Sequence, residues 1–208
     1  MQDKIYKESV GMTTEQIRQL KKEMRKKNKM SRALIDKAER ERLDAAICDI
    51  IASSVSFKYA DTLLLFCPTE TEINVMPLFE KALSLGKRVA FPRCISRGVM
   101  KFYYTESPSD LKEGHYGIRE PLECKENEFT SSSHPLCIVP CLAAAKDGSR
   151  LGYGGGYYDR FLSGFDGISA CVVYDRFVET ELVREKRYDK RTDLLITESG
   201  VLVVGQEK

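Results

Sequence analysis

A glycine-rich segment in the second half of the chain has the residue types that a phosphate-binding turn needs. Four glycines lie between Arg150 and Arg160, and the segment leads from a predicted buried strand into a predicted helix. Glycine lets the backbone approach an anion closely and adopt positive φ values. Backbone N–H groups at the start of a helix can bind phosphate oxygens, and ligands of α/β proteins collect at such strand ends. We interpret the segment as a nucleotide phosphate-binding turn.

This turn differs from the two commonest nucleotide-binding motifs. The Walker pattern G-x-x-x-x-G-K-[ST] is absent, and the dinucleotide pattern G-x-G-x-x-G would need a glycine where Tyr157 stands. The turn therefore has no lysine of its own. Because ATP carries roughly four negative charges and a helix dipole supplies about half a charge, other cations must contribute.

Candidate cations and a candidate metal ligand lie on either side of the turn. Lys21 and Arg25 are one helical turn apart in a basic N-terminal stretch, and can therefore reach one anion together. Asp159 follows the turn directly and offers the hard oxygen that Mg²⁺ prefers. Simpler interpretations exist for the same residues. A glycine cluster can be only a tight turn, and a basic stretch can be a solvated helix face or a weak nucleic-acid patch.

Composition limits the class of protein. The chain has 208 residues, 42% of them hydrophobic, and a net charge of +2, which favours neither nucleic acid nor membrane as partner. No apolar stretch reaches the length of a membrane span, and the first residues do not resemble a signal peptide. Seven cysteines without a C-x-x-C pair, and only two histidines, indicate reduced thiols and argue against a zinc site. We expect a cytoplasmic protein, monomeric by default.

The elements that must position these residues alternate between helix and strand. One helix begins at Thr13 or Thr14 and carries Ile17, Leu20 and Met24 on one side. Further helices are predicted from Asp36, from Pro77 to a stop at Gly86, and from Gly156 to about Leu162. Strands are predicted at 62–66, 87–91 (stopped by Pro92), 99–104, 136–139, 168–174, 194–197 and 201–204, with 105–134 mostly loop.

This order predicts an α/β fold with a largely parallel sheet. Residues 1–12 are polar and are expected to form a flexible N-terminal extension, and residues 13–208 a single domain.

The segment Arg150-Leu-Gly-Tyr-Gly-Gly-Gly-Tyr-Tyr-Asp-Arg160 resembles the signature of the 5-formyltetrahydrofolate cyclo-ligase family. The likeness covers nearly the whole chain in the expected order. It includes the K-x-x-x-R pair of Lys21 and Arg25, the loop Glu70-Thr-Glu72-Ile-Asn, and the segment that starts at Asp193. The resemblance implies a three-layer α/β fold, with helices on both faces of a mostly parallel sheet, akin to sugar-phosphate isomerases and CoA-transferases.

The resemblance also implies an activity. Such enzymes convert 5-formyltetrahydrofolate and MgATP to 5,10-methenyltetrahydrofolate, ADP and phosphate through a phosphorylated formyl group. Arg150, Tyr158 and Glu72 would be catalytic, and Asp159 and Asp193 would hold Mg²⁺. The folate would contact Cys67, Glu72, Met100, Tyr116 and Tyr158. The ATP-binding residues would be Lys21, Arg25, Arg150, Leu151, Gly152, Tyr153, Gly154, Gly155, Gly156, Tyr157 and Tyr158.

Two other classes of function stay open at this point. One is a different phosphate-handling enzyme on the same fold, which would need no ATP. The other is a non-catalytic binder that keeps affinity for nucleotide or folate, or that uses its basic N-terminal helix on RNA. The presence of both Asp159 and Glu72 argues against a degenerate site.

Overall fold

The computed structural model describes residues 12–185 and 187–205, with the side chain of Tyr116 left out. The predicted N-terminal extension therefore lies outside the described residues, except for Met12. At the centre is a seven-stranded sheet of order β12-β11-β9-β6-β1-β2-β3. Its strands are β1 (Thr62–Leu64), β2 (Arg88–Ser96), β3 (Val99–Tyr104), β6 (Pro135–Pro140), β9 (Ile168–Val172), β11 (Leu194–Thr197) and β12 (Gly200–Val203).

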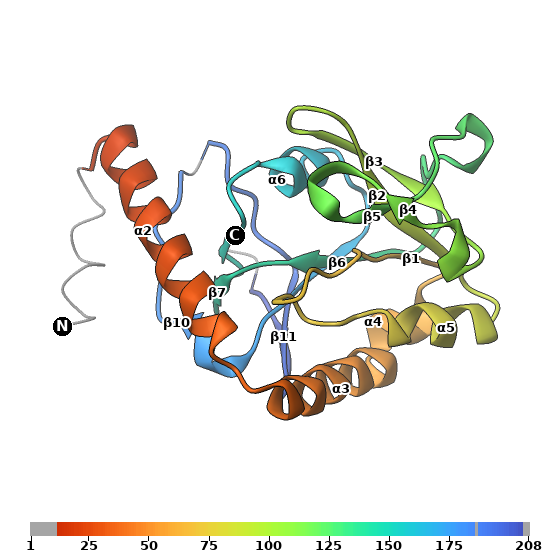
Figure 1. The fold of residues 1–208 in the computed structure, drawn as a ribbon, viewed down its shortest axis with the longest axis horizontal. Coiled ribbons are helices and arrows are strands. Elements are labelled where there is room, and N and C mark those ends of the chain that lie inside the picture. Colours follow the sequence, from red (N-terminus) through yellow and green to blue (C-terminus); the bar gives the residue numbers. More distant parts are fainter. Residues whose placement is uncertain (1–11, 186, 206–208) are drawn as a thin grey trace.

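The inner strands are parallel, and both edges are antiparallel. β2, β1, β6, β9 and β11 run in the same direction, while β3 and β12 return as hairpin partners of β2 and β11. Helices α3 (Lys37–Ser53), α4 (Val55–Tyr59) and α5 (Pro77–Ser84) lie on one face, and α6 (Tyr157–Leu162) lies on the other (Figure 1). The predicted three-layer α/β fold is therefore confirmed.

The core lies between the sheet and the helices, as the apolar periodicity predicts. Ile47 and Ile51 of α3 are fully buried, as is Leu63 of the short strand β1. Phe79 of α5 meets Phe91 of β2 edge to face, with ring centroids 5.2 Å apart. This contact packs α5 against the sheet at β2.

Helix α2 (Thr14–Ala33) stands apart from these layers, along one side of the molecule (Figure 1). Thr13 caps it in a capping box with Gln16, as expected from the sequence. The apolar side chains that were predicted to share one side of the helix are only half-buried, and the buried residues of the helix are Lys21, Asn28 and Arg32. The side of α2 that faces the rest of the protein contacts carbonyl and carboxylate groups. For this reason its buried residues are polar.

Arg32 shows how a charged side chain is buried in this helix. It is 1% exposed, and its guanidinium donates a hydrogen bond of 2.6 Å to the carbonyl of Cys141. The same group lies over the rings of Tyr174 and Phe177, 5.7 and 5.2 Å from their centroids. These contacts partly compensate the buried charge, although Nε of Arg32 has no hydrogen-bond partner among the described residues. They anchor the end of α2 to the strand exit of β6.

Pro92 does not end its strand, contrary to the prediction. β2 continues through it to Ser96, and Pro92 pairs with Phe102 of β3. The parallel pairing with β1 stops at Ala90, so beyond that residue β2 pairs with β3 on one edge and has no ladder bonds to β1 on the other. A proline without an N–H is tolerated where no ladder bond is needed on one edge.

The glycine turn does not follow β6 directly, which is a second correction. A hairpin of β7 (Ala143–Ala145) and β8 (Arg150–Leu151) intervenes, and β10 (Val178–Glu179) extends it to a three-stranded sheet. The predicted loop 105–134 contains a small hairpin, β4 (Lys112–Glu113) and β5 (Arg119–Glu120), between single helical turns. These additions are too short to give a periodic sequence pattern.

All seven cysteines are free thiols. In the described part of the chain, the helices are too short or too polar to cross a membrane. The cytoplasmic location and the monomeric state remain predictions.

Candidate functional site

The glycine turn is an open backbone segment between β8 and α6. Gly154 and Gly156 have positive φ values of 106° and 67°, which disfavour any other residue. A Cβ at Gly154 would also come within 3.4 Å of the Arg25 guanidinium. Gly154 and Gly155 are exposed. The turn therefore presents bare backbone next to a basic side chain.

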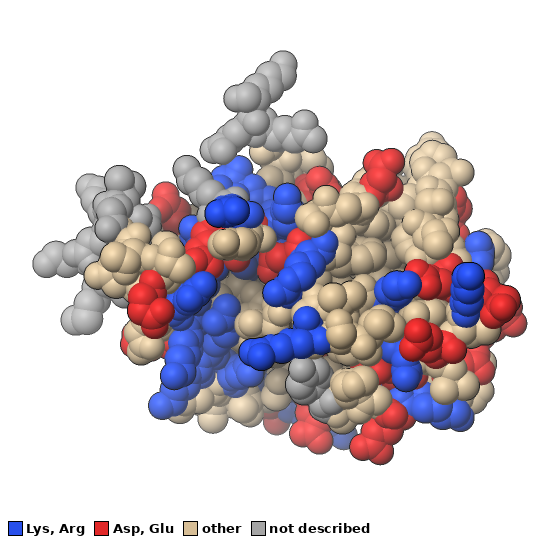
Figure 2. Space-filling model, turned by 90° about the horizontal axis from the view of Figure 1, so that it is seen from above, with Lys and Arg blue, Asp and Glu red and all other residues tan. Residues whose placement is uncertain are grey.

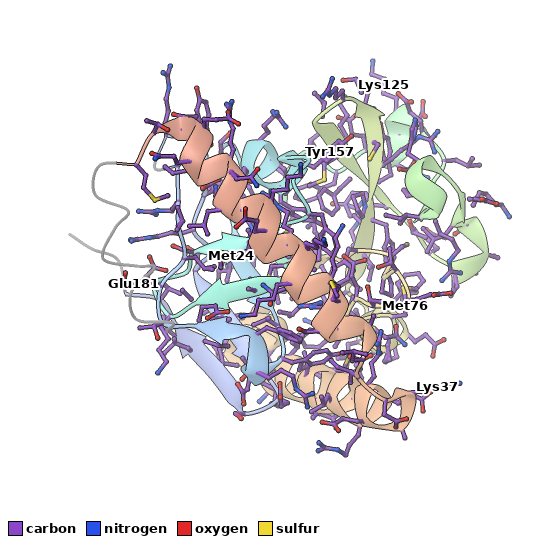
Figure 3. The ribbon with its side chains drawn as sticks, turned by 60° about the vertical axis from the view of Figure 1, so that its left-hand side comes forward. Met24, Lys37, Met76, Lys125, Tyr157 and Glu181 are labelled. Atoms are coloured by element: carbon purple, nitrogen blue, oxygen red, sulfur yellow. The ribbon has the colours of Figure 1, made fainter. Side chains whose placement is uncertain are left out.

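Helix α2 supplies that side chain. Arg25 donates a hydrogen bond of 2.8 Å from its Nε to the carbonyl of Gly152. Lys21, one turn earlier, forms an ion pair with Asp189. Figure 3 looks at the molecule from the side of α2, with Met24 on the helix and Tyr157 at the start of α6. The structure thus brings Arg25 to the turn and pairs Lys21, one helical turn earlier, with Asp189.

Arg150 is held behind the turn by Asp159. Its side chain is 3% exposed and donates a hydrogen bond of 2.9 Å to Oδ1 of Asp159. The same oxygen accepts the backbone N–H of Lys190 at 3.1 Å, and Arg150 also donates to the Lys190 carbonyl. No hydrogen bond is recorded for Oδ2 of Asp159 among the described residues. One carboxylate oxygen of Asp159 is therefore left for a ligand.

Two carboxylates surround the guanidinium of Arg25. Burial lowers the pKa of Arg25, and the charges of Asp189 and Asp159 act in the opposite direction. Asp189 also accepts the backbone N–H of Glu185 at 2.7 Å. The site therefore combines Lys21, Arg25 and Arg150 with two acidic partners, and each cation already has a protein oxygen.

Asp193 has a different environment from Asp159. Its Oδ2 accepts hydrogen bonds from the backbone N–H and the hydroxyl of Ser169, at 2.8 and 2.6 Å. This connects the starts of β9 and β11. No recorded contact of the described residues joins Asp193 to Asp159. Across residues 12–185 and 187–205, no group of three or more His, Cys, Asp or Glu side chains is arranged to hold a metal ion.

A second set of predicted residues meets beneath the turn. Glu72 is 8% exposed, and its Oε2 accepts the backbone N–H of Thr69 at 2.8 Å. The hydroxyl of Tyr158 is buried without a hydrogen-bond partner among the described residues. Burial raises the pKa of Tyr158, and the charges of Cys137, Glu72 and Cys67 add to this effect. Burial also raises the pKa of Cys67 to about 12.

Cys67, Glu72 and Tyr158 thus form one largely buried polar cluster. Its acceptor is a carboxylate, and its free donor is a phenol hydroxyl, which are the groups that recognise a heterocycle with N–H and carbonyl edges. Met100 of β3 is 9% exposed and points to the same face as Phe102, two residues on. Phe102 packs against Tyr158 at 6.5 Å. The side chain of Tyr116 lies outside what the structure describes.

Sequence reasoning missed three residues that complete the site. Asp189 pairs with Lys21, and nothing in its local sequence sets it apart from other acidic residues. Glu120 is 3% exposed and accepts the backbone N–H of Cys94 at 3.1 Å. Arg160, the last residue of the glycine signature, donates to the carbonyls of Gly155 and Gly98, at 3.0 and 3.2 Å. It ties the turn to the β2–β3 hairpin.

The chain is similar to known proteins of one family. Residues 17–185 match the model of the 5-formyltetrahydrofolate cyclo-ligase family. A Caenorhabditis elegans protein named "Probable 5-formyltetrahydrofolate cyclo-ligase" is 30% identical over 154 residues, which is 71% of this chain and 74% of that protein. An Escherichia coli 5-formyltetrahydrofolate cyclo-ligase is 33% identical over 105 residues, or 50% of this chain and 58% of that protein.

Solved structures agree as well. The NMR structure of Aquifex aeolicus 5,10-methenyltetrahydrofolate synthetase has a TM-score of 0.77 and 32% identity, and covers 91% of this chain and 95% of its own. A Mycoplasma pneumoniae 5,10-methenyltetrahydrofolate synthetase has a TM-score of 0.66 over 86% of this chain and 98% of its own. At 23% identity, the second likeness supports the fold alone.

Proposed function

This chain belongs to the 5-formyltetrahydrofolate cyclo-ligase family, and we propose that it converts 5-formyltetrahydrofolate to 5,10-methenyltetrahydrofolate. In this reaction ATP, bound with Mg²⁺, is consumed, and ADP and phosphate are released. The observation that carries this proposal is the contact between Arg25 and the carbonyl of Gly152. It places a basic helix against a glycine turn that has no lysine. A triphosphate bound at such a turn needs cations from another part of the chain.

The reaction suits a site without an activated nucleophile. A formamide is a poor electrophile, and its oxygen is a poor leaving group until it is phosphorylated. The formyl oxygen attacks the γ-phosphorus and the bond from that phosphorus to the ADP oxygen breaks. N10 of the folate then closes on the formyl carbon, and phosphate leaves. Phosphoryl transfer needs positioning and charge neutralisation more than covalent side-chain chemistry, so the buried, neutral thiol of Cys67 is no obstacle.

The phosphates would be held by Lys21, Arg25, Arg150 and the backbone amides of 152–156. The proposal is supported by the positions of the two helix residues at the turn and by the buried side chain of Arg150 beside Asp159. Phosphate oxygens would replace Asp189 as the partner of Lys21. The nucleotide must therefore compete with an internal ion pair, which favours ligands of high negative charge over neutral ones.

Mg²⁺ fits this site through one or two carboxylates, with water and phosphate oxygens as the remaining ligands. Asp159 has a carboxylate oxygen without a hydrogen-bond partner among the described residues, and the charges of Asp159 and Asp189 both act on Arg25. We propose Asp159 as one metal-holding residue and Asp189, in preference to Asp193, as the second. The bound ion would neutralise charge on the transferred phosphoryl group. Asp193 bonds Ser169 through Oδ2 and is not among the carboxylates that act on the charge of Arg25, so we assign it a structural role.

The folate would occupy the cluster of Cys67, Glu72 and Tyr158. Glu72 would accept N–H groups of the pterin ring, and the Tyr158 hydroxyl would donate to the folate once a partner is present. The unpartnered buried hydroxyl supports this role, since burying it without a ligand costs free energy. Met100 and Tyr116 would form the walls of the ring pocket.

An absorbance assay tests the proposal. Purified protein is mixed with 5-formyltetrahydrofolate, ATP and Mg²⁺, and the near-ultraviolet band of the methenyl product is followed. We expect the band to grow only when all three are present, with one ADP formed for each methenyl group. Growth of the band without ATP, or MgATP hydrolysis without methenyl product, would contradict the proposal. Binding of RNA without any binding of MgATP would instead indicate a non-catalytic protein.

A further inference from the structure

Glu120 is a buried carboxylate that the proposed reaction does not use. It ends β5 and is 3% exposed. Its Oε1 accepts the backbone N–H of Cys94 at 3.1 Å, and its Oε2 lies 3.4 Å from Nδ1 of His115 and 3.7 Å from Nη1 of Arg93. A buried charge is costly unless it is paired and hydrogen-bonded. These three partners therefore hold the carboxylate in one position.

Cys94 lies on the part of β2 that has no partner strand on one edge. The ladder between β1 and β2 ends at Ala90, whose carbonyl accepts the N–H of Leu65. Backbone groups of alternate residues point to the same edge of a strand, and Pro92 has no N–H. The N–H of Cys94 is therefore the first donor on this edge beyond Ala90, and Glu120 accepts it.

Glu120 also lies against the loop of residues 114–118. A Cβ at Gly114 would come within 2.6 Å of Cγ and Oε2 of Glu120, so only glycine leaves room for the carboxylate there. The N–H of Gly114 donates a hydrogen bond of 2.9 Å to the carbonyl of Ile118, which closes the loop. Tyr116, a predicted folate residue, belongs to this loop. Contact with Glu120 therefore fixes the base of the loop.

The strand on the other side of this contact leads to Met100. Cys94 and Met100 are paired residues of β2 and β3. Arg93, next to Cys94, donates a hydrogen bond of 2.8 Å to the carbonyl of Pro121. One carboxylate thus connects the strand pair that carries Met100 with the loop that carries Tyr116, and both residues are proposed walls of the folate pocket.

Glu120 is separate from the residues that would hold the phosphates. In Figure 2 basic side chains gather at the left, where α2 lies in Figure 1, and both signs of charge are mixed at the right, where the hairpins β2–β3 and β4–β5 lie. The contacts of Glu120 described above reach β2 and the loop 114–118, whereas the glycine turn meets α2 through Arg25. A change at Glu120 should therefore act on the folate and leave nucleotide binding intact.

We propose that Glu120 is a positioning residue for the folate, which holds the loop 114–118 against β2 so that the loop and β3 together enclose the substrate ring. This inference rests on the proposed function. Glu120 does not touch the reacting atoms, and it acts through the backbone of Cys94 and through the base of the loop.

Steady-state kinetics of two variants test this role. Glu120→Ala removes all three contacts, and we expect the KM for 5-formyltetrahydrofolate to rise about tenfold. The kcat and the KM for ATP should change by less than about twofold, since a rise in one KM at constant kcat reports lost binding of that substrate. Glu120→Gln keeps an acceptor for the Cys94 N–H and loses the charge, so the folate KM should rise only about threefold.

Glu128→Gln is a matched control. Glu128 forms an ion pair of 2.9 Å with Lys101 of β3, so it also joins this hairpin to the segment that contains the loop, but at a more exposed position. Its loss should leave kcat and both KM values unchanged. Urea denaturation of each variant checks that the protein is folded.

Three results would overturn the inference. In folded Glu120→Ala these are an unchanged folate KM, equal rises of the KM for both substrates, which would indicate a general loosening, and a loss of kcat alone, which would place Glu120 in the chemical step. If Glu120→Ala does not fold, Glu120→Gln decides, and a folate KM equal to that of the unmodified protein would then contradict the role. Failure of the proposed function would be seen separately, as absence of methenyl product from the unmodified protein.

Discussion

Lys21 and Asp189 are 168 residues apart in the sequence and form an ion pair beside the glycine turn. Both side chains are largely shielded, with exposed fractions of 10% and 20%. A partly buried lysine with a single carboxylate partner is held where a phosphate could replace that partner. The glycine turn has no lysine of its own, and Lys21 on the N-terminal helix would supply a positive charge to a bound phosphate.

The first prediction concerns this lysine. Lys21→Ala should raise the apparent KM for ATP more than tenfold, because one of the few cations at the turn is lost and Asp189 is left without its partner. Steady-state assays at saturating folate measure the change. Lys22→Ala removes the same charge from an exposed position and should change the KM much less. An unchanged KM in Lys21→Ala would remove α2 from the site.

The second prediction concerns the metal. Asp159→Asn and Asp189→Asn should each raise the Mg²⁺ concentration needed for half-maximal activity, by about tenfold, since each replaces a charged carboxylate ligand by a neutral amide. Mg²⁺ titrations at fixed ATP provide the measurement. Asp193→Asn keeps an oxygen that can accept from Ser169 and should leave the Mg²⁺ requirement unchanged. A large effect only in Asp193→Asn would restore the pair predicted from the sequence.

The third prediction concerns stability at Asp193. Asp193→Ala removes the acceptor of two hydrogen bonds from Ser169 that connect β9 and β11. We expect a loss of about 1–2 kcal/mol in the free energy of unfolding, measured by urea denaturation. If the urea midpoint of Asp193→Ala equals that of the unmodified protein while activity disappears, the structural role assigned to Asp193 is wrong.

The fourth prediction concerns Tyr158. Its buried hydroxyl has no partner in the described structure, so Tyr158→Phe should not destabilise the protein and should stabilise it by about 1 kcal/mol. Such a change raises the melting temperature of a chain of this size by about 2–4 °C. The same variant should lose about tenfold in kcat/KM for the folate. A lower melting temperature with unchanged kinetics would mean that the hydroxyl is satisfied in the protein alone.

The fifth prediction concerns pH and thiol reactivity. Burial raises the pKa of Cys67, and that of Cys48, to about 12. The neutral thiol is therefore favoured, and at pH 8 the thiolate fraction is on the order of 10⁻⁴. In the native protein a disulfide reagent should modify only Cys94 and Cys124 quickly, because the five other cysteines are buried. If Cys67 were labelled rapidly, and if its labelling rate stopped rising with pH near neutral pH, its thiol would not be buried with a raised pKa.

The glycine turn and the two basic residues of the N-terminal helix could be predicted from the sequence, because glycine spacing and the helical spacing of Lys21 and Arg25 are local features. The strands are predicted for the same reason, since a continuous apolar run such as that around Leu63 needs burial on both faces. Pro92 was misjudged because its tolerance depends on where β1 ends, which is a property of the sheet. The buried polar face of α2 was also missed, since its polar partners are distant in sequence.

The choice between Asp189 and Asp193 as the second metal-holding residue also depends on the fold. Local sequence cannot say which of two aspartates four residues apart faces the turn and which one faces Ser169. Asp189 becomes a candidate only when its ion pair with Lys21 is known. Such contacts arise from the chain fold and not from spacing.

Hydrogen–deuterium exchange with and without MgATP tests the central claim, that the glycine turn and α2 together hold the phosphates. We predict that MgATP slows exchange of the amides of 152–156 and of the turn of α2 between Lys21 and Arg25, and that Lys21→Ala loses most of this protection at the same nucleotide concentration. MgATP binding that leaves both segments unprotected while protecting another region would contradict the account.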